Sequence, residues 1–202
     1  MLYTRKGDGG TTKFFGCDQR FSKSSAVAEA LGAVDELNSL LGFVKAQFNV
    51  TGGNQISTSR GYLISTTSEI IDKIQHNLFI VQAELAGAKP RTQRGAGRGK
   101  ALTISSTKVT ALEKIIDGIE KELPPIKTFF VPGGAAPAAL LDYARTVCRR
   151  AERRVIAARE KNEVKLSDST AAYLNRLSSL LYALARLVNH LSGIKEEPPH
   201  YQ

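Results

Sequence analysis

Several residue types are scarce in this chain of 202 residues, and the scarcity of cysteine in particular excludes some classes of protein. The chain has no tryptophan, one methionine, three histidines and two cysteines. Cys17 and Cys148 are too few for a disulfide framework and lack metal-site spacing, which fits a reducing cytoplasm. No apolar run approaches the roughly 18 residues that span a bilayer, and MLYTRKGDGG lacks the hydrophobic core of a signal peptide. We expect a cytoplasmic protein with no membrane segment.

Acidic residues are outnumbered by basic ones, 19 against 28, which gives a net charge of +9. Such an excess invites nucleic acid as a partner. Yet five basic residues share one Gly-rich segment, 87–101, that contains no acidic residue: Lys89, Arg91, Arg94, Arg98 and Lys100. No alternation of aromatic and basic residues suited to base stacking occurs elsewhere. Nucleic acid is therefore not the expected partner, and we predict that 87–101 is a flexible basic loop.

What the chain does contain is helical periodicity. Apolar residues recur at spacings of three and four in five segments, about 25–48, 63–86, 106–123, 135–160 and 168–191. Period-2 alternation is nearly missing, so the pattern predicts a single all-α domain built as a helical bundle. The polar tail at 193–202 is expected to be disordered.

The segment after Pro132-Gly133-Gly134 has two contrasting faces. Arg145, Arg149 and Glu152 stand at i, i+4 and i+7 and so share one face. Cys148 belongs to the apolar stripe on another face, which predicts a buried thiol. The exposed arginines indicate either an anion, such as a polyphosphate or a partner's carboxylates, or a solvated helix with salt bridges.

The N-terminal stretch 3–12 combines three glycines with three threonines. Glycine lets backbone N–H groups converge and threonine adds hydroxyl donors, so this stretch can cradle phosphates. It is no Walker A sequence, and a flexible terminus is the other interpretation. Asp35, at the edge of the first apolar stripe, either faces water or meets a cation of the arginine-rich helix.

These pieces together resemble the propanediol-utilisation type of ATP:cob(I)alamin adenosyltransferase. The matching stretches occur in the family's order: YTRKGDGGTT, Arg20 and Lys23, EALGAVDELNS, IQHNLF, FFVPGG, ARTVCRRAERR and YLNRLSSLLYALAR. The resemblance implies a five-helix ferritin-like bundle that forms a homotrimer, with ATP at each subunit interface. It also implies transfer of the 5′-deoxyadenosyl group of ATP to the cobalt of reduced cobalamin, with release of triphosphate.

The resemblance further implies roles for individual residues. Those expected to wrap ATP are Thr4, Gly7, Asp8, Gly10, Thr12 and Lys23. Arg145 and Arg149 are expected to contact ATP and its phosphates, and Asp35 to form a salt bridge with Arg145. Glu152 and Asn175 match positions on the nucleotide and magnesium side, with Mg²⁺ carried by the ATP phosphates near Glu152 and no direct protein ligand. Phe129 is expected at the lower face of the corrin, in place of the axial base.

The expected chemistry needs no protein nucleophile, because cob(I)alamin is itself one. The protein must align C5′ with cobalt and stabilise triphosphate, which suits Arg, Lys and Mg²⁺. A flavin reductase and a B12-dependent enzyme are further expected partners, and the basic loop is a candidate docking site for them. The main alternative is a non-enzymatic sensor or carrier of ATP or corrinoid, since Ser179 replaces the family's usual aspartate.

A di-metal carboxylate bundle is a third interpretation, because it would share the fold class. That chemistry uses Glu-x-x-His pairs. The positions three residues before His76, His190 and His200 hold Lys73, Leu187 and Glu197, and the last of these pairs lies in the tail. The sequence therefore does not favour this interpretation.

Overall fold

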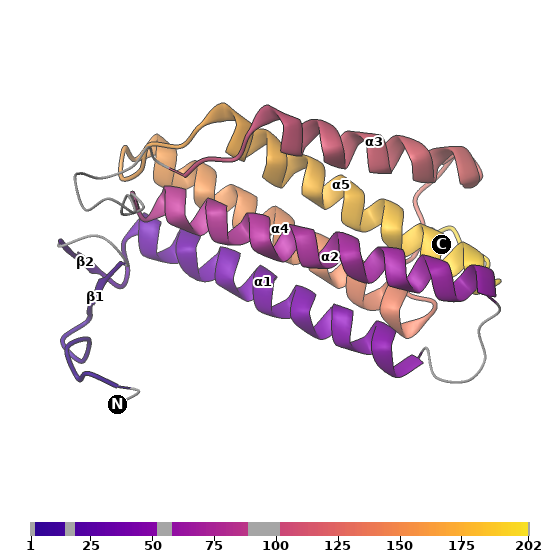
Figure 1. The fold of residues 1–202 in the computed structure, drawn as a ribbon, viewed down its shortest axis with the longest axis horizontal. Helices are drawn as coiled ribbons and strands as arrows, with labels where there is room; N and C mark the ends of the chain where they lie inside the picture. Colours follow the sequence, from indigo (N-terminus) through magenta and orange to yellow (C-terminus); the bar gives the residue numbers. More distant parts are fainter. Residues whose placement is uncertain (1–2, 15–18, 52–57, 89–101, 202) are drawn as a thin grey trace, which may run out of the picture.

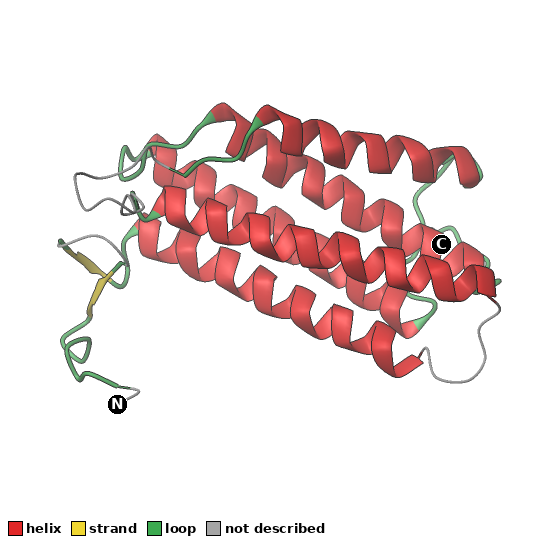
Figure 2. Cartoon of the chain, viewed as in Figure 1, coloured by secondary structure: helices red, strands yellow, loops and turns green. Residues whose placement is uncertain are grey.

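Five long helices make up most of the described part of the chain (Figures 1 and 2). The computed structural model describes residues 3–14, 19–51, 58–88 and 102–201. The helices are α1 (Ala26–Thr51), α2 (Thr58–Leu85), α3 (Ser106–Glu122), α4 (Ala136–Glu160) and α5 (Asp168–Leu191). The predicted all-α bundle of five helices is confirmed, and the main difference is that α2 begins about one turn earlier than its apolar stripe suggested.

The helices lie side by side and bury one continuous core. α1 packs on α2 and α4, while α5 packs on α4 and α3. Figure 1 shows α1, α3 and α5 running in one direction and α2 and α4 in the other. The apolar stripes read from the sequence are the buried surfaces, for example Val34, Leu41 and Leu78, each 0% exposed. Burial of these faces stabilises the helices more than their own propensities do.

Two glutamates hold the starts of helices that lie far from them in sequence. The carboxylate of Glu84, at the end of α2, accepts hydrogen bonds from Ser167 N at 2.6 Å and Thr170 Oγ1 at 2.5 Å. Glu163 Oε2 accepts one from Val27 N at 2.9 Å. The first N–H groups of a helix have no partner within the helix and carry partial positive charge. Each carboxylate therefore stabilises a helix start and fixes the loop beside it.

The N-terminal segment contains a short hairpin that the sequence did not predict. Strands β1 (Thr11–Lys13) and β2 (Arg20–Ser22) pair antiparallel, with Thr12 opposite Phe21. The rings of Phe14 and Phe21 stack at 4.7 Å between centroids. Figure 1 shows this segment projecting from the end of the bundle where α1 begins, so it is available to a second molecule.

The buried thiol predicted at Cys148 is confirmed. Its side chain is 0% exposed, and burial raises the pKa of the thiol to about 12. Cys17 and the basic residues 89–100 lie outside the described residues. Within the described ranges no helix is long and apolar enough to cross a membrane.

Candidate functional site

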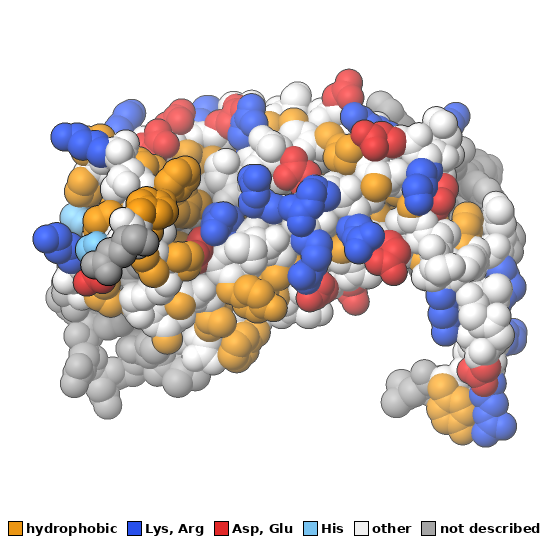
Figure 3. Space-filling model, turned by 180° about the vertical axis from the view of Figure 1, so that it is seen from behind, with side chains coloured by type: hydrophobic (Ala, Val, Ile, Leu, Met, Phe, Trp, Pro, Cys, Tyr) orange, Lys and Arg blue, Asp and Glu red, His pale blue; other side chains and the backbone are white. Residues whose placement is uncertain are grey.

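Helix α4 supplies both core and site because its two faces differ in chemistry. Ala144, Val147 and Ala151 are buried at 0–1% exposure and pack in the core. Arg145 is partly buried and Arg149 is exposed on the other side. Figure 3 shows Lys and Arg side chains gathered across the middle of the face opposite to the view of Figure 1. The packed stripe of α4 therefore fixes the direction in which its arginines point.

The first pocket lies between α4 and α5 and has a volume of about 340 Å³. Arg149, Glu152 and Asn175 line it together, which brings three of the predicted site residues into one place. Asn175 Nδ2 donates to Glu152 Oε1 at 3.0 Å, and Asn175 Oδ1 accepts from Arg176 Nη1 at 2.8 Å. Both ends of the amide are thus engaged, and Asn175 orients Glu152 in a pocket that Arg149, Arg153 and Glu160 also line.

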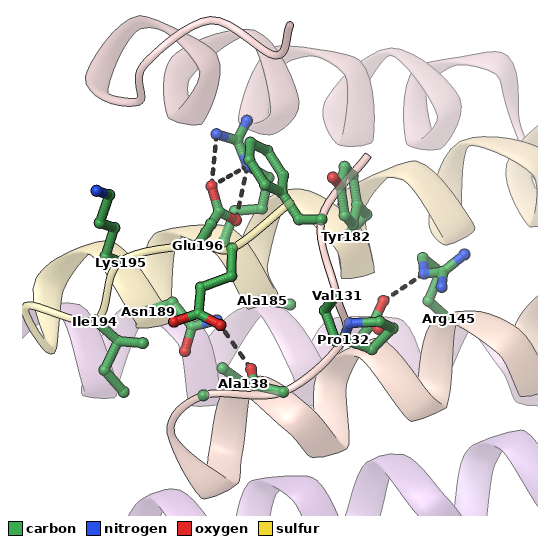
Figure 4. A pocket seen from close by; sticks show the side chains of 16 residues that line it. Val131, Pro132, Ala138, Arg145, Tyr182, Ala185, Asn189, Ile194, Lys195 and Glu196 are labelled. Atoms are coloured by element: carbon green, nitrogen blue, oxygen red, sulfur yellow. Dashed lines mark hydrogen bonds and ion pairs between the residues drawn. The ribbon is translucent and has the colours of Figure 1, made fainter. Parts of the chain in front are cut away.

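The second pocket has a volume of about 320 Å³ and lies beside Arg145 (Figure 4). Arg145 Nε donates to Asp142 Oδ1 at 2.5 Å, and its guanidinium lies 5.8 Å from the ring centroid of Tyr182. Partial burial raises the pKa of Tyr182 above its usual value. Arg145 is therefore held by its own helix and by α5, and one wall of its pocket is the segment Phe130–Gly134.

That segment is a tight turn fastened to α5. Asn189 Nδ2 donates to Gly133 O at 3.0 Å, and Asn189 Oδ1 accepts from Ala135 N at 3.0 Å. Gly134 has φ = 95°, and a Cβ there would overlap the Asn189 amide. Only glycine meets both requirements. Phe129, just before the turn, is 79% exposed and is the most exposed of the described phenylalanines.

The N-terminal loop, that is, the described residues before α1, is held in a defined turn by contacts among its own residues. Lys23 N donates to Gly10 O at 2.9 Å, and Gly10 has φ = 75°. A Cβ on Gly7 would lie 3.3 Å from Lys23 Nζ, so the ammonium group sits directly over that glycine. Arg20 donates to Thr11 Oγ1 at 2.8 Å and to the carbonyl of Lys6. The predicted ATP-wrapping residues Thr4, Gly7, Asp8, Gly10, Thr12 and Lys23 all belong to this segment.

Asp35 lies elsewhere in the single chain. Its Oδ1 accepts a hydrogen bond from Gln82 Nε2 of α2 at 3.3 Å. The ion pair of Arg145 within the chain is with Asp142 instead. One chain therefore holds three separate groups: the Arg149 pocket, the Arg145 pocket with Phe129 near it, and the N-terminal loop.

Sequence reasoning missed several residues that shape these pockets, namely Asp142, Tyr182, Arg186, Asn189 and Glu196. Asp142 could have been found, because it stands three residues before Arg145 on one helix face. Asn189 could not, since its partners are more than 50 residues away in sequence.

Glu196 and Glu197 belong to the tail that the sequence predicts to be disordered. Glu196 forms an ion pair with Arg186 at 2.9 Å, and Glu197 O accepts a hydrogen bond from Val131 N at 2.9 Å. This part of the tail therefore makes specific contacts with α5 and with the turn before α4.

Comparisons with a family model, with related proteins and with solved structures agree with one another. The family model described as cobalamin adenosyltransferase matches residues 2–188. The chain is 38% identical to the corrinoid adenosyltransferase of Bacillus subtilis over 96% of this chain and 89% of that protein. It is 36% identical to the corrinoid adenosyltransferase PduO of Citrobacter freundii, covering 94% of this chain but 50% of the length of that protein.

A solved structure with the same fold is a variant PduO-type ATP:corrinoid adenosyltransferase from Lactobacillus reuteri, complexed with cobalamin and ATP. The two chains superpose with a TM-score of 0.78 and 29% identity, and each is covered completely.

Proposed function

The chain belongs to the cobalamin adenosyltransferase family, and we propose that it transfers the 5′-deoxyadenosyl group of ATP to the cobalt of cob(I)alamin. In this reaction the cobalt attacks C5′, a cobalt–carbon bond forms, and the C5′–oxygen bond breaks. The bonding electron pair leaves with triphosphate, and the products are adenosylcobalamin and triphosphate. The observation that carries the proposal is the pair of pockets that display Arg145 and Arg149 from one helix, with Phe129 exposed beside them.

The arginines suit the leaving group. Triphosphate carries several negative charges, and a guanidinium offers donors that match phosphate oxygens in pairs. Arg149 would bind phosphate in the pocket where Asn175 orients Glu152. Arg145, pre-oriented by Asp142 and Tyr182, would stabilise the charge that develops as triphosphate leaves.

Mg²⁺ fits this arrangement as a companion of ATP. Among the described residues no three or more His, Cys, Asp and Glu side chains gather to hold a metal ion. Glu152 and Glu160 line the Arg149 pocket, and Mg²⁺ is commonly held by one or two carboxylates together with substrate phosphates. The ion would neutralise phosphate charge, while Glu152 would orient it or one of its waters.

Phe129 serves the other substrate. The Phe129 ring is 79% exposed, so it is free to contact a flat apolar partner. A corrin face offers that partner. Filling the lower face with an apolar ring would exclude the axial base, favour four-coordinate cobalt and ease its reduction to the nucleophile.

The complete site requires a homotrimer in this proposal. The N-terminal loop projects from its own bundle (Figure 1), so it would wrap ATP bound against the arginines of a neighbouring subunit. Asp35 would meet Arg145 across the same interface. A flavin reductase would supply the electron in a reducing cytoplasm, where the free thiol of Cys148 is stable.

Anaerobic turnover with reduced cobalamin, ATP and Mg²⁺ tests the proposal, followed by the spectral change of cobalt alkylation. We expect Arg145→Ala to abolish turnover and Phe129→Ala to reduce it strongly while ATP still binds. Binding of ATP and corrinoid by the wild type without turnover would favour a sensor or carrier instead. The retention of Asp35, Arg145, Arg149 and Phe129 together argues against that alternative.

A further inference from the structure

Arg186 of α5 is a buried cation that the proposed chemistry does not use. The residue is 5% exposed and stands in a stretch of α5 whose other members, such as Leu184 and Leu187, are apolar and buried. Removing a guanidinium from water is costly unless every donor finds an acceptor. The buried guanidinium of Arg186 is therefore expected to fix the position of the groups that accept its hydrogen bonds.

The acceptors of Arg186 come from two distant parts of the chain. Its Nε lies 3.0 Å from both carboxylate oxygens of Glu196, and its Nη2 lies 2.9 Å from Glu196 Oε2. Nη2 also donates to Pro124 O, just after α3, at 3.1 Å. The fork of the guanidinium thus ties α5 to the C-terminal segment and to the start of the α3–α4 connection.

The same guanidinium contacts Phe130, the second residue of the aromatic pair before the turn. It lies 5.3 Å from the ring centroid of Phe130, within the range of a cation–π contact. The backbone beyond is fastened by the hydrogen bond from Val131 N to Glu197 O at 2.9 Å. Figure 4 shows Glu196 on one side of Val131 and Pro132 and Arg145 on the other.

These contacts set the direction of Phe129. Phe130 is partly buried, whereas Phe129 and Val131 on either side are 79% and 56% exposed. Exposure thus alternates over these three residues, as it does along an extended chain, so drawing Phe130 inward against Arg186 turns Phe129 outward. If Phe130 were released, the connection could rotate and Phe129 would no longer have one fixed position.

We propose that Arg186 and Glu196 form a latch that positions Phe129 for the reaction, as positioning residues that act through Phe130 and the C-terminal segment. The proposal rests on the proposed function of Phe129 at the lower face of the corrin. With the latch closed, the ring is held where it excludes the axial base. With the latch open, the loop gains freedom and the five-coordinate form returns.

The test is the electron paramagnetic resonance spectrum of cob(II)alamin bound to the full chain with ATP, which separates four-coordinate from five-coordinate cobalt. Three variants are compared with the wild type. They are Glu196→Gln, Arg186→Lys and Phe129→Ala, with Glu120→Gln on the exposed face of α3 as a control that makes the same change of charge.

We expect Glu196→Gln and Arg186→Lys to lose most of the four-coordinate signal, as Phe129→Ala does, and to lower kcat roughly 10- to 100-fold. The KM for ATP should change less than twofold, because the Arg149 pocket is untouched. Glu120→Gln should match the wild type in the signal and in kcat.

A double variant separates loss of the latch from loss of stability, because each single change leaves one buried group unpaired and could destabilise the fold. Arg186→Met with Glu196→Leu removes both charges and keeps an apolar filling, which proteins commonly tolerate. We expect this variant to melt near the wild-type temperature and yet to lack the four-coordinate signal. A merely structural pair would instead restore the signal together with stability.

The outcomes separate the two claims. A signal that disappears in Phe129→Ala but survives in both latch variants and the double variant overturns the latch alone. A wild type without the signal, or a signal unaffected by Phe129→Ala, overturns the role of Phe129 and the latch with it.

Discussion

Asn175 and Glu152 are joined across α4 and α5 by a hydrogen bond of 3.0 Å, in which the Asn175 amide donates to the Glu152 carboxylate. The other end of the amide accepts from Arg176, so the amide has only one orientation that satisfies both neighbours. Oε1 is therefore engaged by Asn175, and in the proposed site Oε2 would face Mg²⁺ or its waters. An uncharged residue thus sets the orientation of the Glu152 carboxylate.

Asn175→Asp should weaken binding of Mg²⁺–ATP. The substitution replaces a donor with a second carboxylate beside Glu152, and the two charges repel. We expect about tenfold lower ATP affinity by isothermal titration calorimetry, a change of about 1.4 kcal/mol. His190→Ala, on the exposed end of α5, should bind ATP as the wild type does. An unchanged affinity of Asn175→Asp would remove Asn175 from the nucleotide site.

Asp35→Asn should lower turnover at least tenfold, since the proposed partner of Asp35 is an arginine of a neighbouring subunit. Gln82→Ala should change turnover less than twofold, because one hydrogen bond of 3.3 Å on an exposed surface contributes about 0.5 kcal/mol. Anaerobic turnover of both variants checks this. Equal losses in the two would show that Asp35 acts through Gln82 within its own chain.

Glu84→Ala should destabilise the fold by roughly 2–3 kcal/mol, because it leaves Ser167 N and Thr170 Oγ1 without their acceptor at the start of α5. Glu84→Gln keeps the shape and loses the charge, so about 1 kcal/mol is expected. Urea unfolding followed by circular dichroism measures both. Glu120→Ala on exposed α3 should stay within about 0.5 kcal/mol of the wild type, and a Glu84→Ala value in that range would contradict the capping role.

Cys148 should be inert to thiol reagents in the native state at pH 8 and react only on unfolding. Burial raises the pKa of its thiol from 9.0 to about 12, so the native thiolate is rare at this pH. Labelling with an aromatic disulfide reagent in a Cys17→Ser background isolates this thiol. Fast labelling of the folded protein would contradict its burial.

The same burial predicts how stability depends on pH. A thiol that is harder to ionise in the folded state stabilises the fold fully below pH 9, and that contribution is lost as pH rises towards 12. Burial raises the pKa of Tyr173 to about 12 as well, so it acts in the same direction from about pH 10. The free energy of unfolding should fall across this window, and Cys148→Ala should flatten the early part of the fall.

The helices, the buried thiol and the two faces of α4 could be predicted from sequence because each is a local, periodic property. Val147 and Cys148 lie on one face and Arg145 and Arg149 on another whatever the rest of the chain does. That Arg149 and Asn175 lie in one pocket depends on how α5 packs against α4. The sequence indicated it only through the resemblance to the adenosyltransferase family.

The α3–α4 connection could not be predicted in the same way. FFVPGG indicates a turn, but nothing within it shows that Asn189 would fit against Gly134 or that Arg186 would reach Pro124. The contacts of Glu196 were equally hidden, because a polar tail with two prolines is typical of disorder. In both cases the stabilising partner is more than 50 residues away or lies on another element, so local composition misleads.

The buried stripe of α4 also fixes the rotation of that helix about its own axis. Successive residues of an α-helix are about 100° apart, so inserting one residue between Arg145 and Val147 would force a choice. Either the stripe of Val147 and Ala151 stays in the core and Arg145 turns away from its pocket, or the arginine stays and the core opens. Relatives of this chain can therefore lengthen the loops around α4, but the spacing within the helix can change only together with the site.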